Sequence, residues 1–182
     1  MEYTRRGAAF SSCGKYRYLL WREWAGTRTS KNWQTFAEDP TYYGEAKSLV
    51  FAMLNPSTAD GNDDDPTIRP CVRLASYHGY LRIEVVNLFA YRATDPRALL
   101  ALTHNDDPVG VDNQRYWQER NDDFVVCAWG NHGTYLDQDQ TALGWVYTTS
   151  KLRCLGLNKS RAPKHPLFVR KDTPLLPYTG RR

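Results

Sequence analysis

Short apolar runs alternate with amphipathic segments along most of the chain, and this rhythm predicts strands that alternate with helices. Four runs have the length of buried strands, and they span residues 47–54, 81–88, 123–129 and 152–157. Four helices are expected between them, at 70–77, 96–102, 112–120 and 134–146. Pro70 is tolerated only in a first turn, so the first helix should begin near Thr67, and Asp95 should cap the second.

The apolar runs lack strict alternation, as expected for strands that are buried on both faces of a parallel sheet. We therefore predict a three-layer α/β/α domain with a mainly parallel, four-stranded central sheet. The aromatic segment 16–24 should add a strand or hairpin at an edge, and 25–45 should form a long loop. One domain is expected over 1–182, with a hairpin and loop lead-in over 1–45 and an α/β core over 46–177.

Polar and aromatic residues follow each predicted strand. The ligands of parallel sheets bind outside the carboxyl ends of the strands, so these residues are expected to converge on one cleft. The candidates for substrate contact at this edge, in chain order, are Asn55, Pro56, Ser57, Asn87, Tyr91, Trp129, Asn131 and His165.

Four aspartates follow the first strand, at Asp60, Asp63, Asp64 and Asp65. They do not form an EF-hand, because the glycine and glutamate that such a loop needs at its sixth and twelfth positions are absent. Acidic groups before a helix stabilise its dipole, but four together repel one another. The alternative is that they receive a cationic group, such as a substrate amine or a metal ion, with Asp60 and Asp64 as the candidate contacts.

The chain has 182 residues and a net charge of +4, which permits a nucleic-acid partner without requiring one. Its four cysteines are far apart, so neither disulfides nor a zinc site is expected, and a reducing cytoplasm is favoured. No run approaches the ~20 apolar residues of a membrane span. No phosphate loop, GxGxxG, GxSxG or HExxH motif occurs, so no cofactor is expected.

Several motifs identify the chain as similar to a bacterial and phage family known only as a domain of unknown function. They are MLNPSTAD with DDPT, EVVNLFAYRATDP, the DPVG-x-DN run of 107–113, AWG-x-HG, and CLGL followed by HPLF, and they cover most of residues 47–177. That family in turn resembles, more distantly, the uracil/thymine-DNA glycosylase superfamily. There, too, an apolar strand ends in Asn-Pro or Asp-Pro, a second strand ends in an Asn-containing loop, and a His-Pro segment comes late.

The resemblance implies a glycosylase-like fold and an enzyme that removes a modified or mismatched base from DNA. Asn55 would position the attacking water, Pro56 would shape the turn, Asn87 would read a pyrimidine edge, and His165 would hydrogen-bond the departing base. The segment HPLF lacks the serine that usually follows His-Pro in the superfamily, and Asn55 stands where the fast uracil-removing enzymes have aspartate. Five cations are candidate contacts to DNA phosphates: Arg69, Arg73, Arg92, Lys159 and Lys164.

Two alternatives remain open at this point. One is a base-hypermodification enzyme that joins an amine to an activated pyrimidine in phage-type DNA, in which the aspartates would bind the amine. The other is a module that binds nucleic acid or nucleotides without chemistry.

Overall fold

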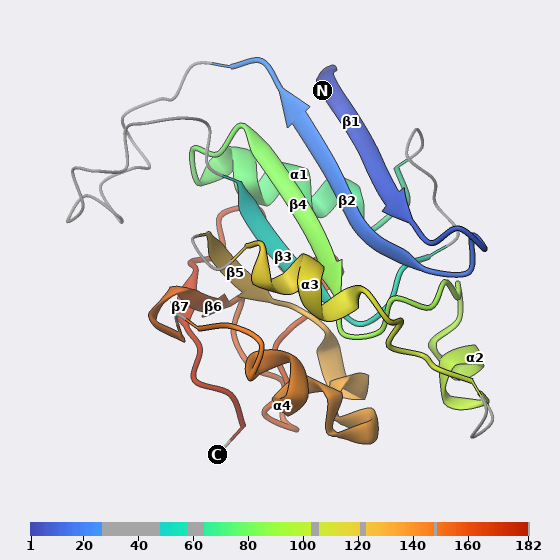
Figure 1. Cartoon of the computed structure of the whole chain (residues 1–182). Coiled ribbons are helices and arrows are strands. Elements are labelled where there is room, and N and C mark those ends of the chain that lie inside the picture. The colour runs from blue at the N-terminus through green and yellow to red at the C-terminus, as the bar shows by residue number, and fades with distance from the viewer. Residues whose placement is uncertain (27–47, 58–63, 103–105, 121–122, 148, 182) are drawn as a thin grey trace.

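The computed structural model of the chain contains a seven-stranded sheet flanked by helices (Figure 1). It describes residues 1–26, 48–57, 64–102, 106–120, 123–147 and 149–181. The predicted loop 25–45 and the aspartates Asp60 and Asp63 lie largely or wholly outside these ranges. None of the helices described is long and apolar enough to span a bilayer.

The strands lie in the order β1-β2-β4-β3-β5-β6-β7. Their bounds are β1 Tyr3–Phe10, β2 Arg17–Trp24, β3 Leu49–Met53, β4 Arg82–Asn87, β5 Phe124–Cys127, β6 Leu152–Cys154 and β7 Leu176–Pro177. The α-helices are α1 Ile68–Tyr77, α2 Pro96–Leu100, α3 Asn113–Gln118 and α4 Gln138–Leu143. The described ranges also contain the 3₁₀ helices η3 Gly130–Asp137, η4 Thr149–Lys151 and η5 Pro166–Phe168.

The four predicted core strands are present and parallel. β3 pairs with β4 on one side and with β5 on the other, and β5 pairs with β6. β2 adds antiparallel to β4, so the expected hairpin does join one edge. Its partner strand β1 was not predicted, because Thr4, Arg5 and Arg6 are exposed and leave no apolar alternation to detect.

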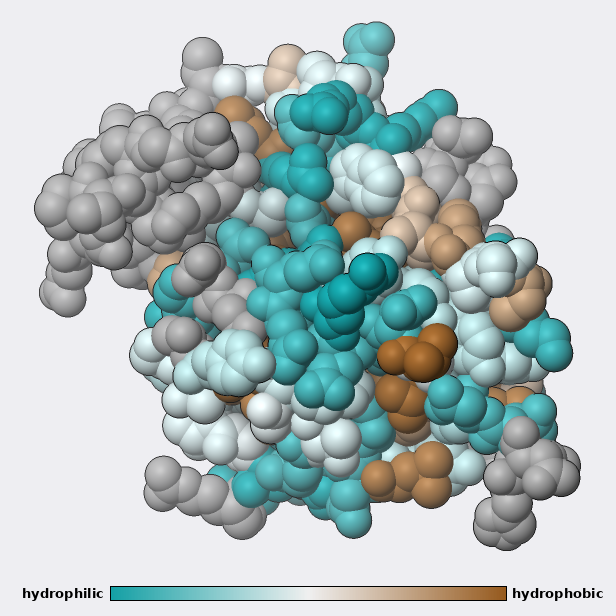
Figure 2. All heavy atoms as spheres, viewed as in Figure 1, coloured by the Kyte–Doolittle hydropathy of each residue, from teal (hydrophilic) through white to brown (hydrophobic). Residues whose placement is uncertain are grey.

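Every residue of the central strand β3 is buried, and its side chains divide the core into two layers. Val50 and Ala52 face one cluster with Trp117 of α3 and Ala142 of α4. Leu49, Phe51 and Met53 face the other with five residues of α1: Ile68, Cys71, Val72, Leu74 and Ala75. Figure 1 shows α1 behind the sheet and α3 and α4 in front of it. The face shown in Figure 2 carries hydrophilic residues and residues of intermediate hydropathy, with hydrophobic residues in small patches. The α/β class is thus confirmed, while the glycosylase-like form of it stays a prediction.

The predicted starts of the first two helices are accurate, but the last predicted helix and the fourth core strand are shorter than expected. α1 begins at Ile68 after Thr67, and the Asp95 carboxylate accepts a hydrogen bond from the Arg97 amide at the start of α2. The expected helix over 134–146 is instead η3 followed by α4. The chain breaks at Leu136 and Asp137, whose φ angles of 54° and 51° are left-handed. The fourth core strand ends at Cys154 rather than at residue 157, two residues before Gly156 turns the chain with φ 98°.

The N-terminal hairpin is fixed to the loop before α1 by a buried ion pair. The Arg22 side chain on β2 is fully buried, and its Nε lies 2.8 Å from Asp64 Oδ1. The Tyr3 hydroxyl of β1 donates to the other carboxylate oxygen of Asp64. The carboxylate therefore makes internal contacts in place of the expected contact with a substrate amine, because a buried guanidinium requires a nearby counter-charge.

We predict that Asp64→Asn lowers the free energy of unfolding by about 3 kcal/mol, because it removes the negative charge of a carboxylate that is paired with the fully buried Arg22 guanidinium. Urea denaturation of both proteins measures the difference. Asp172→Asn is the matched control, since it breaks an Arg–Asp pair that is exposed to solvent, and it should change stability little. Equal effects of the two substitutions would contradict the structural role of Asp64.

Candidate functional site

A polar pocket opens at the carboxyl ends of β3, β4 and β5. The chain leaves β3 toward β4 on one side, while β5 lies on the other side, so the loops that follow β3 and β5 diverge. Such a point of divergence is where open parallel sheets bind ligands. The pocket has a volume of about 560 Å³, within the range of small-molecule sites.

The pocket brings together six of the residues that were expected at this edge. They are Asn55, Ser57, Asn87, Trp129, Asn131 and His165. Their convergence confirms that the polar residues after successive strands share one cleft.

Asn87 supplies a buried amide that faces the pocket with hydrogen-bonding capacity to spare. The residue ends β4 and is 1% exposed. Its backbone carbonyl accepts from Asn113 Nδ2 at 3.0 Å and from Trp117 Nε1 at 2.9 Å, which holds the residue in place. Its side-chain Nδ2 has no hydrogen-bond partner in the described part of the chain. An unsatisfied buried donor is costly, so this one is suited to a ligand oxygen or nitrogen that accepts.

The Asn55 side chain is oriented by the backbone beneath it. Its Nδ2 donates to the carbonyl oxygens of Ala93, at 2.7 Å, and of Pro56, at 3.2 Å. An amide has two N–H donors, and both are used in this way. The carbonyl oxygen Oδ1 is therefore the part of the side chain that can accept a hydrogen bond from a ligand or a water.

His165 presents a neutral imidazole. It caps η5, and its Nδ1 accepts from the Leu167 amide at 3.3 Å, which places the ring proton on Nε2. Burial lowers the pKa of His165, and the negative charge of Asp65 opposes this shift only in part. The histidine thus contributes one N–H donor to the pocket wall without a positive charge near pH 7.

Two charged residues of the pocket, Arg17 and Asp65, were not predicted as site residues. The Asp65 carboxylate accepts from the amides of Thr67 and Ile68 at 2.8 and 2.9 Å and from the Ser57 hydroxyl, so it caps α1 while lining the pocket. Arg17, from β2, is 2% exposed, and burial lowers its pKa to about 10 against the attraction of Asp65. A capping aspartate before a helix was the available signal for Asp65, whereas nothing local marks Arg17.

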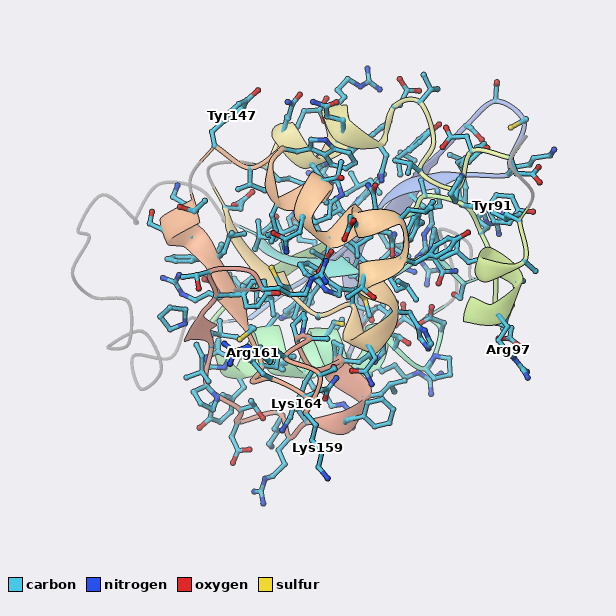
Figure 3. All side chains as sticks on the ribbon, turned by 90° about the horizontal axis from the view of Figure 1, so that it is seen from below. Tyr91, Arg97, Tyr147, Lys159, Arg161 and Lys164 are labelled. Carbon is cyan, nitrogen blue, oxygen red and sulfur yellow. The ribbon has the colours of Figure 1, made fainter. Side chains whose placement is uncertain are left out.

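Other expected contacts lie elsewhere. Pro56 is buried behind the pocket, where its carbonyl accepts from the Ala93 amide. Tyr91 packs edge-to-face on Tyr16, and Figure 3 shows it far from the labelled lysines. Asp64 is not among the described residues that line the pocket. Across the described ranges, no three His, Cys, Asp or Glu side chains gather as a metal site would require.

Four of the five candidate phosphate contacts fall into two groups. Arg69 and Arg73 are exposed on α1, and Lys159 and Lys164 lie on the loop that leads to His165. Figure 3 shows these two lysines together with Arg161, which was not predicted, on one side of the molecule. Arg92 is separate, because its guanidinium lies over the Phe10 ring and donates to the Gly14 carbonyl.

Fold and site together define an α/β domain with a polar binding pocket at the carboxyl edge of a parallel sheet. The chain belongs to the family described as "Protein of unknown function (DUF1643)", whose model matches residues 17–167. No curated protein and no solved structure gives a significant match to the chain.

We predict that Asn87→Leu leaves the free energy of unfolding unchanged or raises it by about 1 kcal/mol, because it removes a buried donor that has no partner. Urea denaturation without ligand measures this. Asn113→Leu is the matched control. Its Nδ2 donates to the Asn87 and Leu88 carbonyls, so its loss should lower stability by about 1–3 kcal/mol. Equal destabilisation by both variants would argue that Asn87 is structural.

A second prediction concerns pH. Burial lowers the pKa of both His165 and His78, so the unfolded chain binds protons more readily than the folded chain below about pH 6.5. The two neutral histidines therefore contribute fully to the free energy of unfolding above that pH. This contribution is lost as the pH falls through their pKa values in the folded state. Thermal melts should therefore show that the Tm of the wild type falls between pH 7.5 and 5.5. The fall in Tm should be smaller in the double variant His78→Gln/His165→Gln. The same pH dependence in both proteins would contradict this.

Proposed function

We propose that the pocket holds a nucleobase extruded from DNA and that the protein hydrolyses the N-glycosidic bond, as a DNA glycosylase does. The observation that carries this proposal is the buried, unpartnered amide donor of Asn87 in the same pocket as the neutral His165 and the oriented Asn55. Enzymes that act on a base take it out of the stack and read its edge by hydrogen bonds within an apolar slot.

The pocket has the means to recognise a base. Asn87 Nδ2 and His165 Nε2 are donors, and the oxygens and ring nitrogens of a base are acceptors. The buried Trp129 indole forms part of the wall, which provides an apolar surface for a ring. Leu167 and Phe168 also line the pocket, although they are 46% and 81% exposed. Exposed apolar side chains at the pocket are suited to contact the bases beside an extruded one.

The chemistry follows from where charge develops. As the bond between the base and C1′ breaks, its electron pair goes to the base and the sugar becomes cationic. The His165 N–H strengthens its hydrogen bond to the base as the negative charge grows. A water held by Asn55 Oδ1 then bonds to C1′ and releases its proton to solvent. The Asp65 carboxylate in the same pocket favours the cationic sugar.

The hypermodification alternative would use the aspartates as its amine site. Of these, Asp64 is paired with Arg22, and Asp65 is hydrogen-bonded by two amides and Ser57, whereas Asp60 and Asp63 lie outside the described residues. The non-catalytic module uses the same pocket, so activity has to separate it from the enzyme.

We predict that Asn55→Ala and His165→Ala each lower the single-turnover rate of base release by about 10²–10³, because each removes one preorganised group. The substrate is found first, by incubating the protein with DNAs that carry diverse modified bases and measuring released base by mass spectrometry. Near-wild-type rates in both variants would exclude this assignment of roles.

Gln118→Ala is the matched control, since this amide on α3 is not among the described residues that line the pocket. Its Nε2 donates to the Tyr147 hydroxyl at 2.9 Å, so its removal should change the rate of base release little. Unaltered DNA with every modified base, together with retained binding, would favour the non-catalytic module.

A further inference from the structure

A second, basic depression lies on the other side of the segment that carries His165. It has a volume of about 360 Å³ and is formed where α1 packs against η5 and the residues after it. Arg73, Arg170 and Lys171 line it, together with the apolar residues Pro70, Leu74, Pro166 and Val169. No carboxylate belongs to its described lining, so we call it the basic groove.

One short stretch of chain forms a wall of both the pocket and the basic groove. His165, Leu167 and Phe168 line the pocket, while Pro166 between them lines the groove. The two depressions therefore share this single segment of chain as a common wall. A nucleic-acid strand carries one charge per about 3.4 Å of helix axis, so a phosphate next to a base held in the pocket lies within reach of the groove.

The positive charge of the groove is available to an incoming anion. Arg170 pairs with Asp172 at 3.1 Å, but both side chains are exposed, and such a pair is weak enough for a phosphate to replace it. Within the described ranges, Arg73 donates from Nε to the Arg69 carbonyl at 3.4 Å, and its terminal guanidinium nitrogens have no partner there, so they can bind a ligand. A guanidinium fork binds phosphate oxygens in pairs, and Lys171 adds a point charge.

We infer that the basic groove receives the phosphodiester of the nucleotide next to the extruded one, so that the substrate is a polynucleotide strand rather than a free nucleoside or nucleotide. The identity of the strand rests on the proposed function of the pocket. The groove assigns phosphate contacts to Arg170 and Lys171 as well as to Arg73, and it lets backbone binding hold the strand while the pocket reads one base.

The test measures binding of a fluorescent DNA oligonucleotide by anisotropy, between about 50 and 200 mM salt. In the triple variant Arg73→Ala/Arg170→Ala/Lys171→Ala, the slope of log affinity against log salt should become shallower by about 2–3, because each phosphate contact contributes about 0.7–0.9. Affinity at low salt should fall tenfold or more. The matched control Arg5→Ala/Arg6→Ala/Lys15→Ala removes the same charge from the exposed N-terminal hairpin and should change the slope by less than one.

The outcomes separate the groove from the pocket. Three outcomes would overturn the groove inference: an unchanged slope in the groove variant, an equal change of slope in both triple variants, or no oligonucleotide binding by the wild type. These outcomes count against the groove even if Asn87→Leu abolishes base release, because that result would support only the pocket. A mononucleotide that binds as tightly as the oligonucleotide would overturn the polymeric substrate. A reduced slope in the groove variant, with no base released from any DNA, would uphold the groove and reject the glycosylase. Circular dichroism of each variant confirms that it is folded.

Discussion

The parallel pairing of β3 on both sides is the constraint on which the rest of the structure depends. Each residue of β3 is buried, and its backbone hydrogen bonds to the neighbouring chains extend to the end of the strand. There the Leu88 amide donates to the Met53 carbonyl, and the Ala128 amide donates to the Ala52 carbonyl, both at 2.8 Å. α1 then carries the chain to one side while β5 lies on the other, so the loops after β3 and β5 must separate. Three strand ends thus surround a space that no backbone fills, and the pocket follows from the strand order rather than from any single residue.

Asn55, Asn87 and His165 are held in the pocket by hydrogen bonds that involve the backbone, and not by bonds to one another. Asn55 is fixed by the Ala93 carbonyl, the backbone of Asn87 by Asn113 and Trp117, and His165 by the Leu167 amide. These contacts leave Asn55 Oδ1, Asn87 Nδ2 and His165 Nε2 to bind a ligand. A site built in this way needs little reorganisation when charge develops, which is the condition for electrostatic catalysis.

The sequence predicted what depends on local pattern and on topology, and missed what depends on tertiary contacts. Unalternating apolar runs located the core strands, and the rule for strand ends brought Asn55, Asn87 and His165 together before any coordinates. Arg17 reaches the pocket only because β2 pairs antiparallel with β4, which no local signal specifies. The break at Leu136 and Asp137 has no glycine to announce it. Arg170 and Lys171 acquire a role only through the packing of α1 against η5.

The contacts that Asp64 and Asp65 make within the protein explain how acidic residues before α1 can lie beside a site for a polyanion. Asp64 and Asp65 are neighbours in sequence but have different surroundings. Asp64 neutralises the buried Arg22, and Asp65 is stabilised by the first amides of α1 and by the charge of Arg17. Their negative charge is therefore compensated inside the protein, whereas the cations of the basic groove and of the loop before His165 face solvent. The net charge of +4 does not show that negative and positive side chains lie in different parts of the protein. The electrostatic potential beside the pocket, more than the total charge, decides whether a phosphate backbone is attracted there.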